Sequence, residues 1–337
     1  MRGARVCKGI VFGLVLSFIA SGIAAERDPY EAVVEIAGRA LPAVVGLHAF
    51  SPPGSPAARM LGEDRRGTGF IIDPAGIILT SNHVVVGAGK ILVTLTDGRS
   101  FSAKVLGSDA TKDLAILRVK AEGLPSLPLG RTNNLRLGQG VVVVGSNHAS
   151  YREVTVGTIN AIGPFVGQWE FMLDRIIQTD ALVQLGYSGG PLLNMRGEVV
   201  GVVSFLRPTV PGPAGLVVPI EEASAIRKEA LHLNHGMGRK ARRAWLGTVA
   251  LAVAGGKVAI QGLTPGGPAM RANIKPKDFI THVNSIPISG LEEYYQEIWK
   301  YPPGTEIRLT IEREGKTLLV AIQSADRDQF FGPTPSE

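Results

Sequence analysis

The sequence of 337 residues contains one cysteine, Cys7, and this residue lies near the N-terminus. A disulfide framework is therefore excluded, even in an oxidising compartment, where disulfides would be permitted. No cysteine follows the apolar run of residues 9–25, which argues against a lipid anchor at that point. The fold must consequently be large enough to be stable on its hydrophobic core alone.

The sequence also has only a small excess of one sign of charge. The net charge is +6, and residues 1–25 account for three basic residues and no acidic one, which leaves +3 for the rest. That balance gives no reason to expect a nucleic-acid partner. One local cluster, residues 227–243, has six Lys or Arg against Glu229. We interpret it as a solvated interdomain linker; attraction to an anionic membrane surface is the alternative.

The longest apolar run is that of residues 9–25. Arg2, Arg5 and Lys8 precede it, and small residues follow before the first acidic one. This order is typical of a secretory signal. A run of 17 residues is at the short limit for a membrane span, so an uncleaved single-span anchor is the alternative. Both interpretations predict export.

Short runs rich in valine and isoleucine fill the sequence from Gly67 to Pro219. Turn signals such as Asp97-Gly98 separate them. Many short strands at close spacing predict an antiparallel barrel or sandwich. The flanking segments predict a helix over 28–40, a strand over 44–50, a loop over 51–66 and a closing helix over 221–233.

A second pattern starts at Ala244 and spans about 80 residues, within the usual size of a small domain. It predicts a small mixed β/α unit, with strands at 244–253 and 257–263, a helix at 290–300 and a strand pair within 302–323. The residues beyond this unit are expected to be loose.

Ser188, in "GYSGG", is a candidate nucleophile. Hydrolysis of an amide by serine requires a base, an orienting acid and donors for the developing oxyanion. Glycines at 186, 189 and 190 permit unusual backbone angles, which can aim the N–H groups of Gly186 and Ser188 at one point. An ordinary glycine turn is the alternative. The hairpin that follows excludes the nucleophile elbow of an α/β-hydrolase.

The candidate base is His83, at the end of an apolar strand, and among the other histidines only His148 in "GSNHAS" is a rival. The candidate acid is Asp113, directly before a predicted strand. We expect Asp109 to be a turn residue. Asp180 lies close to Ser188 in sequence, and a structural hydrogen-bonding role is the alternative to a role as the acid. The order His, Asp, Ser within an all-β region is that of the chymotrypsin-type barrels.

Three stretches of the sequence carry a resemblance to a known protease family. They are "GTGFIIDPAGIILTSNHVVVGA", "DGRSFSAKVLGSDATKDLAILRV" and "IIQTDALVQLGYSGGPLLNMRGEVVGV". Over residues 30–325 the chain resembles the HtrA (DegP/DegS-like) serine proteases. The resemblance implies a mainly β fold, a chymotrypsin-like double β-barrel protease domain followed by a small α/β PDZ domain. It implies His83 as general base, Asp113 as its orienter and Ser188 as nucleophile, with oxyanion donors at Gly186 and Ser188.

The second unit resembles a PDZ domain, a module that binds C-terminal peptides by strand addition. By this resemblance a loop at Trp245, Leu246, Gly247 and Thr248 would hold the peptide carboxylate through its backbone. Core packing is the alternative role for the side chains of Trp245 and Leu246. The resemblance also implies a homotrimer.

The expected domains follow from these patterns: a signal peptide or membrane anchor at 1–25, a trypsin-like protease domain at 26–232, a basic linker at 233–243, a PDZ domain at 244–325 and a flexible tail at 326–337. The stretches "ALVQL" and "GVVSFL" would line the first substrate pocket. Neither contains an acidic residue, so we expect cleavage after a small or medium apolar residue rather than after Arg or Lys.

The leader and the resemblance together predict an exported serine endopeptidase of the bacterial periplasm, soluble or anchored to the inner membrane by residues 9–25. Its substrates would be unfolded or mislocalised proteins, and no metal or other cofactor is expected. One alternative is a catalytically weak, protease-like chaperone or peptide-binding scaffold. Another is a membrane-anchored signalling protease.

The chain departs from the family pattern close to the candidate nucleophile. Tyr187 stands where the family usually has asparagine, and Gln184-Leu185 replaces the usual Asn-Pro. The stretch "GSNHAS" differs from the usual Asn-Pro-Phe-Gly, and only "VALAVAGG" separates the carboxylate loop from the next strand. These departures concern regulation and specificity more than the type of reaction.

Overall fold

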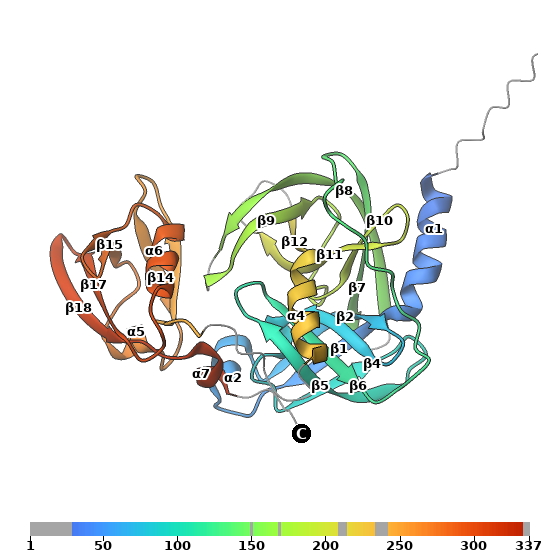
Figure 1. Ribbon diagram of the computed structural model, residues 1–337, viewed down its shortest axis with the longest axis horizontal. Helices are drawn as coiled ribbons and strands as arrows, with labels where there is room; N and C mark the ends of the chain where they lie inside the picture. The colour runs from blue at the N-terminus through green and yellow to red at the C-terminus, as the bar shows by residue number, and fades with distance from the viewer. Residues whose placement is uncertain (1–28, 149–150, 168–169, 208–213, 233–241, 333–337) are drawn as a thin grey trace, which may run out of the picture.

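Two closed six-stranded barrels and a smaller sheet account for most of the chain (Figure 1). The computed structural model describes residues 29–148, 151–167, 170–207, 214–232 and 242–332. The predicted leader, Asp28 at the start of the predicted helix over 28–40, and most of the predicted linker therefore lie outside the described residues. In the part of the chain that is described, no helix has the length and apolar character needed to cross a membrane.

The first barrel has the strand order β1-β2-β3-β6-β5-β4, with every pair antiparallel. Its interior is apolar. Its strands are β1 (Val44–Phe50), β2 (Asp64–Asp73), β3 (Ile77–Ser81), β4 (Lys90–Thr94), β5 (Ser100–Asp109) and β6 (Leu114–Val119).

The second barrel has the equivalent order β10-β11-β12-β9-β8-β7. Its strands are β7 (Gly140–His148), β8 (Tyr151–Val166), β9 (Met172–Thr179), β10 (Pro191–Asn194), β11 (Val199–Arg207) and β12 (Ala214–Pro219). Helix α4 (Glu221–His232) follows β12 and contacts β5 and β6 of the first barrel. The predicted closing helix is thereby confirmed.

A shared core joins the two barrels. It contains side chains from both, such as Phe70 and Leu79 from the first barrel and Val142 and Val202 from the second. All five residues of β3 are buried, because one face of the strand fills its own barrel and the other faces this shared core. That geometry explains why the sequence shows continuous apolar runs rather than alternation.

The N-terminal part of the described chain contains a helix before the first barrel and the first strand of that barrel. Helix α1 (Pro29–Ala40) and strand β1 agree with the predicted helix and strand. The predicted loop over 51–66 is wrong in part, because it contains helix α2 (Pro56–Leu61) and the start of β2. The Ser55 side chain caps α2 by accepting from the Ala58 N–H at 3.2 Å, and Pro56 occupies the first turn. Both features favour a helix start even in a proline-rich segment.

The third unit is a sheet in the order β13-β14-β15-β17-β18, with β16 paired to β15. Its core includes the buried rings of Tyr294 and Tyr295 on α6. Its elements are β13 (Thr248–Ala252), β14 (Val258–Leu263), α5 (Pro268–Arg271), β15 (Phe279–Val283), β16 (Ile286–Pro287), α6 (Leu291–Trp299), β17 (Glu306–Arg313) and β18 (Lys316–Gln323). This arrangement agrees with the predicted mixed β/α unit.

The segment after β18 corrects the expectation of a flexible tail at 326–337 over its first part, residues 326–331, while residues 333–337 lie outside the described residues. Residues Arg327–Phe331 form helix α7, and the Asp326 carboxylate caps it by accepting from two backbone N–H groups. Phe331 is buried against Ala57 of α2 and the Trp245 ring. Figure 1 shows α7 beside α2, between the third unit and the barrels. A short aromatic sequence thus becomes ordered because two domains supply its apolar contacts.

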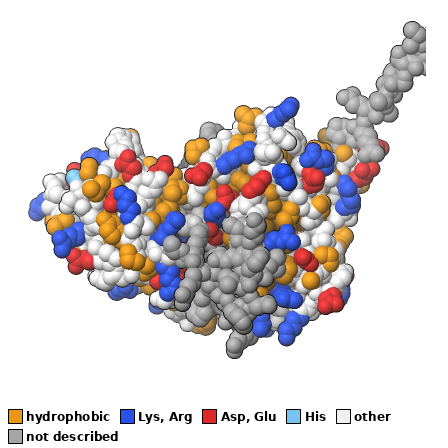
Figure 2. All heavy atoms as spheres, viewed as in Figure 1, with side chains coloured by type: hydrophobic (Ala, Val, Ile, Leu, Met, Phe, Trp, Pro, Cys, Tyr) orange, Lys and Arg blue, Asp and Glu red, His pale blue; other side chains and the backbone are white. Residues whose placement is uncertain are grey.

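The surface carries both signs of charge. Figure 2 shows Lys and Arg side chains interspersed with Asp and Glu over the described part of this face. Charges of both signs are therefore spread over this face rather than separated by sign.

Candidate active site

His83 lies on α3 (Asn82–Val85), a single helical turn directly after the buried strand β3. Arg65 on β2 supports this turn, donating from Nη1 to the His83 carbonyl oxygen at 2.8 Å and from Nη2 to the Val86 carbonyl oxygen at 2.7 Å. Burial lowers the pKa of Arg65 to about 10. A rigid strand and a buried cation therefore hold the backbone turn that carries the imidazole. Arg65 carried no signal in the sequence.

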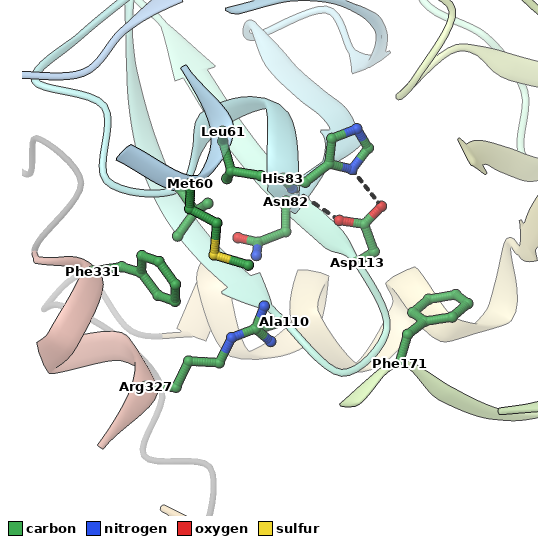
Figure 3. Close-up of a pocket in the computed structure, with 10 residues that line it drawn as sticks. Met60, Leu61, Asn82, His83, Ala110, Asp113, Phe171, Arg327 and Phe331 are labelled. Carbon is green, nitrogen blue, oxygen red and sulfur yellow. Dashed lines mark hydrogen bonds and ion pairs between the residues drawn. The ribbon is translucent and has the colours of Figure 1, made fainter. Parts of the chain in front are cut away.

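Asp113 is buried in the turn between β5 and β6 and faces His83 (Figure 3). Its Oδ1 accepts from the His83 backbone N–H at 2.8 Å, and its Oδ2 lies 2.8 Å from His83 Nδ1. The same Oδ2 accepts from the Ser204 hydroxyl at 2.5 Å. Its backbone has a φ of +52°, a region that aspartate tolerates better than most residues. The carboxylate thus fixes which imidazole nitrogen faces away from it.

Ser188 lies in the connection between β9 and β10, on the second barrel. Its hydroxyl donates to the Ser204 carbonyl oxygen at 2.8 Å. Ser204 on β11 therefore bonds both the candidate nucleophile, through its carbonyl, and the candidate acid, through its hydroxyl. The structure brings His83, Asp113 and Ser188 into one network across the junction of the barrels. Ser204 was not among the candidate residues predicted from the sequence. The signal that could have identified it is a polar residue within the apolar stretch "GVVSFL".

The backbone around Ser188 is held by the first barrel. Thr68 on β2 donates its hydroxyl to the Gly186 carbonyl oxygen at 2.6 Å and its N–H to the Ser188 carbonyl oxygen at 2.9 Å. Gly189 has a φ of +89°, and a Cβ there would lie 2.1 Å from the Thr68 carbonyl oxygen, so only glycine fits. Among the described residues, no acceptor is bonded to the N–H groups of Gly186 and Ser188.

Asp109, Asp180 and His48 have partners outside the His83–Asp113–Ser188 network. Asp109 accepts from the Thr111 N–H and hydroxyl, as a turn residue does, and Asp180 accepts from the Thr158 N–H and hydroxyl. The turn role expected of Asp109 is confirmed, and Asp180 has the structural hydrogen-bonding role. His48 bonds Asp64. The side chain of the rival His148 lies outside the described residues.

The predicted carboxylate loop of the PDZ unit, residues 245–248, begins with two side chains that pack in apolar clusters. Trp245 pairs through its N–H and C=O with Ala325, and its ring lies 4.8 Å from that of Phe330. Leu246 is part of the PDZ core. The side chains of both residues therefore pack in apolar clusters, in agreement with the alternative considered for them. Gly247, with a φ of +76°, makes the turn at this loop.

A pocket extends from the His83–Asp113 pair to helix α7 (Figure 3). Phe331 and Arg327 of α7 lie on the side of the pocket opposite His83. Its lining residues are Met60, Leu61, Asn82, His83, Val86, Ala110, Asp113, Phe171, Arg327 and Phe331. In the described part of the chain, no group of three or more His, Cys, Asp or Glu is placed to bind a metal ion.

Glu170, next to this pocket, is fully enclosed at the contact between the second barrel and the PDZ unit. Trp299 of α6 donates its indole N–H to Glu170 Oε2 at 3.4 Å, and Oε1 has no partner among the described residues. Burial raises the pKa of Glu170 to about 7, although the positive charges of Arg327 and Arg243 act in the opposite direction.

Comparisons with known proteins agree with this architecture. Residues 67–202 match the model of the trypsin-like peptidase domain, and residues 239–323 match that of the PDZ domain. A Synechocystis protein named "Putative serine protease HhoA" is 34% identical over 288 residues, covering 80% of this chain and 72% of that protein. A "Probable periplasmic serine endoprotease DegP-like" of Halomonas elongata is 35% identical, and the chain spans 60% of its length.

Solved structures extend the likeness to three dimensions. The HtrA-type protease AlgW with a tripeptide has a TM-score of 0.54 at 27% identity, with 90% of this chain and 98% of that chain covered. A serine endoprotease from Yersinia pestis has a TM-score of 0.52 at 28% identity, with 87% and 97% covered.

Two six-stranded barrels with a His–Asp–Ser network at their junction, followed by a PDZ sheet, define a chymotrypsin-like serine endopeptidase with a C-terminal PDZ domain. The predicted fold class is therefore confirmed. The chain belongs to the HtrA family of serine proteases.

Proposed function

We propose that this protein hydrolyses peptide bonds with Ser188 as nucleophile, His83 as general base and Asp113 as the group that orients the imidazole. The observation that carries the proposal is the double hydrogen bond between Asp113 and His83. It places Nδ1 against the carboxylate, which assigns proton transfer to Nε2, and it stabilises the charged imidazole that forms when the base takes a proton.

In the acylation step, the Ser188 hydroxyl turns from the Ser204 carbonyl toward His83 Nε2. Free enzymes often show such loose catalytic contacts, which tighten when substrate binds. Ser188 Oγ then attacks the peptide carbonyl while His83 takes its proton, and His83 returns that proton to the leaving amine. Water repeats the sequence on the acyl-enzyme, with His83 again as the base.

The N–H groups of Gly186 and Ser188 would stabilise the tetrahedral oxyanion. Both lie in the loop that Thr68 holds through two hydrogen bonds, so these donors would need little reorganisation at the moment of reaction. Losing one such donor costs about 10²- to 10³-fold in turnover.

The test is casein cleavage combined with fluorophosphonate labelling of the purified full chain. We expect the wild type to cleave unfolded casein and to be labelled stoichiometrically at Ser188, and we expect a Ser188→Ala variant to do neither. Equal cleavage by both proteins would overturn the nucleophile. A folded wild type that is neither labelled nor active would instead favour the catalytically weak chaperone or scaffold.

The cellular setting is part of the same proposal. We infer a protein exported to the periplasm that acts on unfolded or mislocalised proteins, since the DegP-like relatives carry the word periplasmic in their names. N-terminal sequencing of the mature protein distinguishes a cleaved leader from an anchor at residues 9–25, and hence the quality-control protease from a membrane-anchored signalling protease. Sedimentation equilibrium tests the homotrimer.

The domain limits are proposed as a leader at 1–25, a protease domain at 26–232, a linker at 233–243 and a PDZ domain at 244–325. We propose that the PDZ domain binds C-terminal peptides, with the backbone of Trp245, Leu246, Gly247 and Thr248 at the carboxylate. Strand β13 supports this role, since it is the edge strand of its sheet and strand addition requires a free edge. Titration with peptides that differ only in a free or amidated C-terminus tests it.

A further inference from the structure

Tyr187 lies between the two proposed oxyanion donors, yet its side chain points away from the reaction. The ring is fully buried and packs in the interior of the second barrel, with neighbours that include Val143 and Leu192. A large aromatic side chain inside the barrel is thus attached directly to the backbone that carries the nucleophile. Because barrel side chains enclose the ring, its position is coupled to that of the backbone beside Ser188.

Gly145 provides the space for this ring. A Cβ at Gly145 would lie 2.2 Å from Tyr187 Cγ, closer than any real contact allows. Gly145 is also the direct cross-strand partner of Glu153 in the β7–β8 ladder. Directly opposed residues in an antiparallel pair present their side chains on the same face. The ring therefore lies over the bare backbone of Gly145 and extends toward Glu153.

The far end of the ring is tied to that carboxylate. The Tyr187 hydroxyl donates a hydrogen bond to Glu153 Oε2. Burial first, and then this hydrogen bond, raise the pKa of Tyr187 well above its ordinary value, so the phenol keeps its proton and remains the donor. A hydrogen bond to a charged acceptor is stronger than one between neutral groups.

Glu153 is itself held by a rigid element. The adjacent Arg152 points to the first barrel, where it donates from Nε to the Val44 carbonyl oxygen at 3.0 Å and from Nη2 to the Thr94 carbonyl oxygen at 2.6 Å. The start of β8 is thus anchored to the first barrel, which also holds the backbone around Ser188. The carboxylate that receives the phenol has a defined position relative to both barrels.

We propose that Tyr187 is a positioning residue for the oxyanion site: its ring over Gly145 and its hydrogen bond to Glu153 fix the peptide unit that carries the Ser188 N–H. This inference rests on the proposed function. The backbone bonds from Thr68 hold the carbonyl oxygens of Gly186 and Ser188, and the Tyr187 side chain holds the residue between them. The asparagine that is usual at this position could not fill the same volume.

The experiment measures fluorophosphonate labelling of the full chain, with kinact and KI determined separately, for Tyr187→Phe, Glu153→Ala and Glu153→Gln. A misplaced donor acts in the transition state, so kinact should fall about tenfold in Tyr187→Phe and Glu153→Ala, with KI within about twofold. Glu153→Gln retains a carbonyl acceptor and should restore most of the rate. The double variant Tyr187→Phe/Glu153→Ala should be no slower than either single one.

Tyr151→Phe is the matched control, since Tyr151 is two residues from Glu153 but 57% exposed, and it should label at the wild-type rate. Gly145→Ala should slow labelling at least as much as Tyr187→Phe, because its methyl group displaces the ring. Thermal unfolding of each variant separates these losses from lost stability.

The positioning role is overturned if Tyr187→Phe and Glu153→Ala both label at the wild-type rate, or if KI alone changes. In either case a labelled wild type leaves the proposed function standing. A folded wild type that is not labelled overturns both together.

Discussion

At the scale of the residue, the carboxylate of Asp113 is the best-connected group of the site. It accepts hydrogen bonds from the His83 N–H, the His83 imidazole and the Ser204 hydroxyl. A neutral amide at 113 keeps the shape but donates where the carboxylate accepts, which favours the wrong imidazole tautomer. Both the orientation and the charge of the imidazole therefore depend on this residue.

Asp113→Asn should lower kcat at neutral pH by about 10⁴-fold while leaving the protein folded. The physical reason is the loss of the acceptor that selects the His83 tautomer. Casein hydrolysis and a thermal unfolding curve on the same preparation provide the measurement. Turnover within tenfold of wild type would show that another group orients His83.

Ser204→Ala should lower kcat/KM roughly threefold to tenfold, since a hydrogen bond to a charged group contributes about 1.5–3 kcal/mol and part of that is recovered by the two remaining donors. Its carbonyl contact with Ser188 is retained, because that contact is made by the backbone. Ser324→Ala, at another buried serine, is the control and should not change turnover. An unchanged kcat/KM in Ser204→Ala would contradict the role.

At the scale of the element, helix α7 is the clearest case of a segment whose structure is decided by its surroundings. It has only five residues, Arg327–Phe331, far fewer than an isolated helix needs in water. Phe331 is buried between Ala57 of α2 and the Trp245 ring. The helix is therefore stable only while both domains are in contact with it.

Phe331→Ala should release α7 from this contact, because removal of a buried phenylalanine side chain costs about 3–5 kcal/mol. Faster hydrogen exchange at 326–331 and new proteolytic cleavage there are the expected results, with the barrels unchanged. Gln329→Ala, at an exposed position of the same helix, is the control. Equal exchange in both variants would show that α7 is held by other contacts.

At the scale of the whole molecule, Glu170 links the second barrel to the PDZ domain. Trp299 of the PDZ domain donates to it, and the titratable groups that act on it or lie beside it include Arg327, Arg243, Tyr294 and Tyr295. Its pKa of about 7 lies above the ordinary value of 4.5. The folded state therefore binds its proton more tightly than the unfolded state does.

The sign of the pH dependence follows from this shift. Below its ordinary pKa of 4.5, Glu170 is protonated in both the folded and the unfolded state, so its burial costs no ionisation free energy at that pH. As the pH rises toward 7 the unfolded state alone loses the proton, and the folded state loses stability by roughly 3 kcal/mol. Below pH 5 the domain contact should accordingly be tighter than at pH 8.

Glu170→Gln should match the wild-type unfolding free energy near pH 4, below the ordinary carboxyl pKa, and exceed it near pH 8. Denaturant unfolding of both proteins at the two pH values measures this difference, and other titrating groups cancel in the comparison. Glu63→Gln, at an exposed carboxyl, should show no such gap. The same pH dependence in Glu170→Gln and wild type would refute the assignment.

Much of this architecture could be predicted from local patterns. Apolar runs and glycine turns indicated the strands of both barrels, and the helices at 29–40 and 221–232 agree with the helices predicted there. The predicted loop at 51–66 and tail at 326–337 were wrong where helices α2 and α7 form. Their composition signals a loop, and distant apolar partners override it.

The sequence by itself determined which residue types were available for the chemistry: one serine among glycines, with a histidine and an aspartate before it in the order of a barrel protease. Only the tertiary structure decided that Ser204 bonds Asp113 across 91 residues and that Tyr187 reaches Glu153 across 34. Such contacts depend on barrel closure and strand register, which local sequence does not encode. The same closure turned Tyr187 from a departure beside the nucleophile into a side chain buried within the barrel.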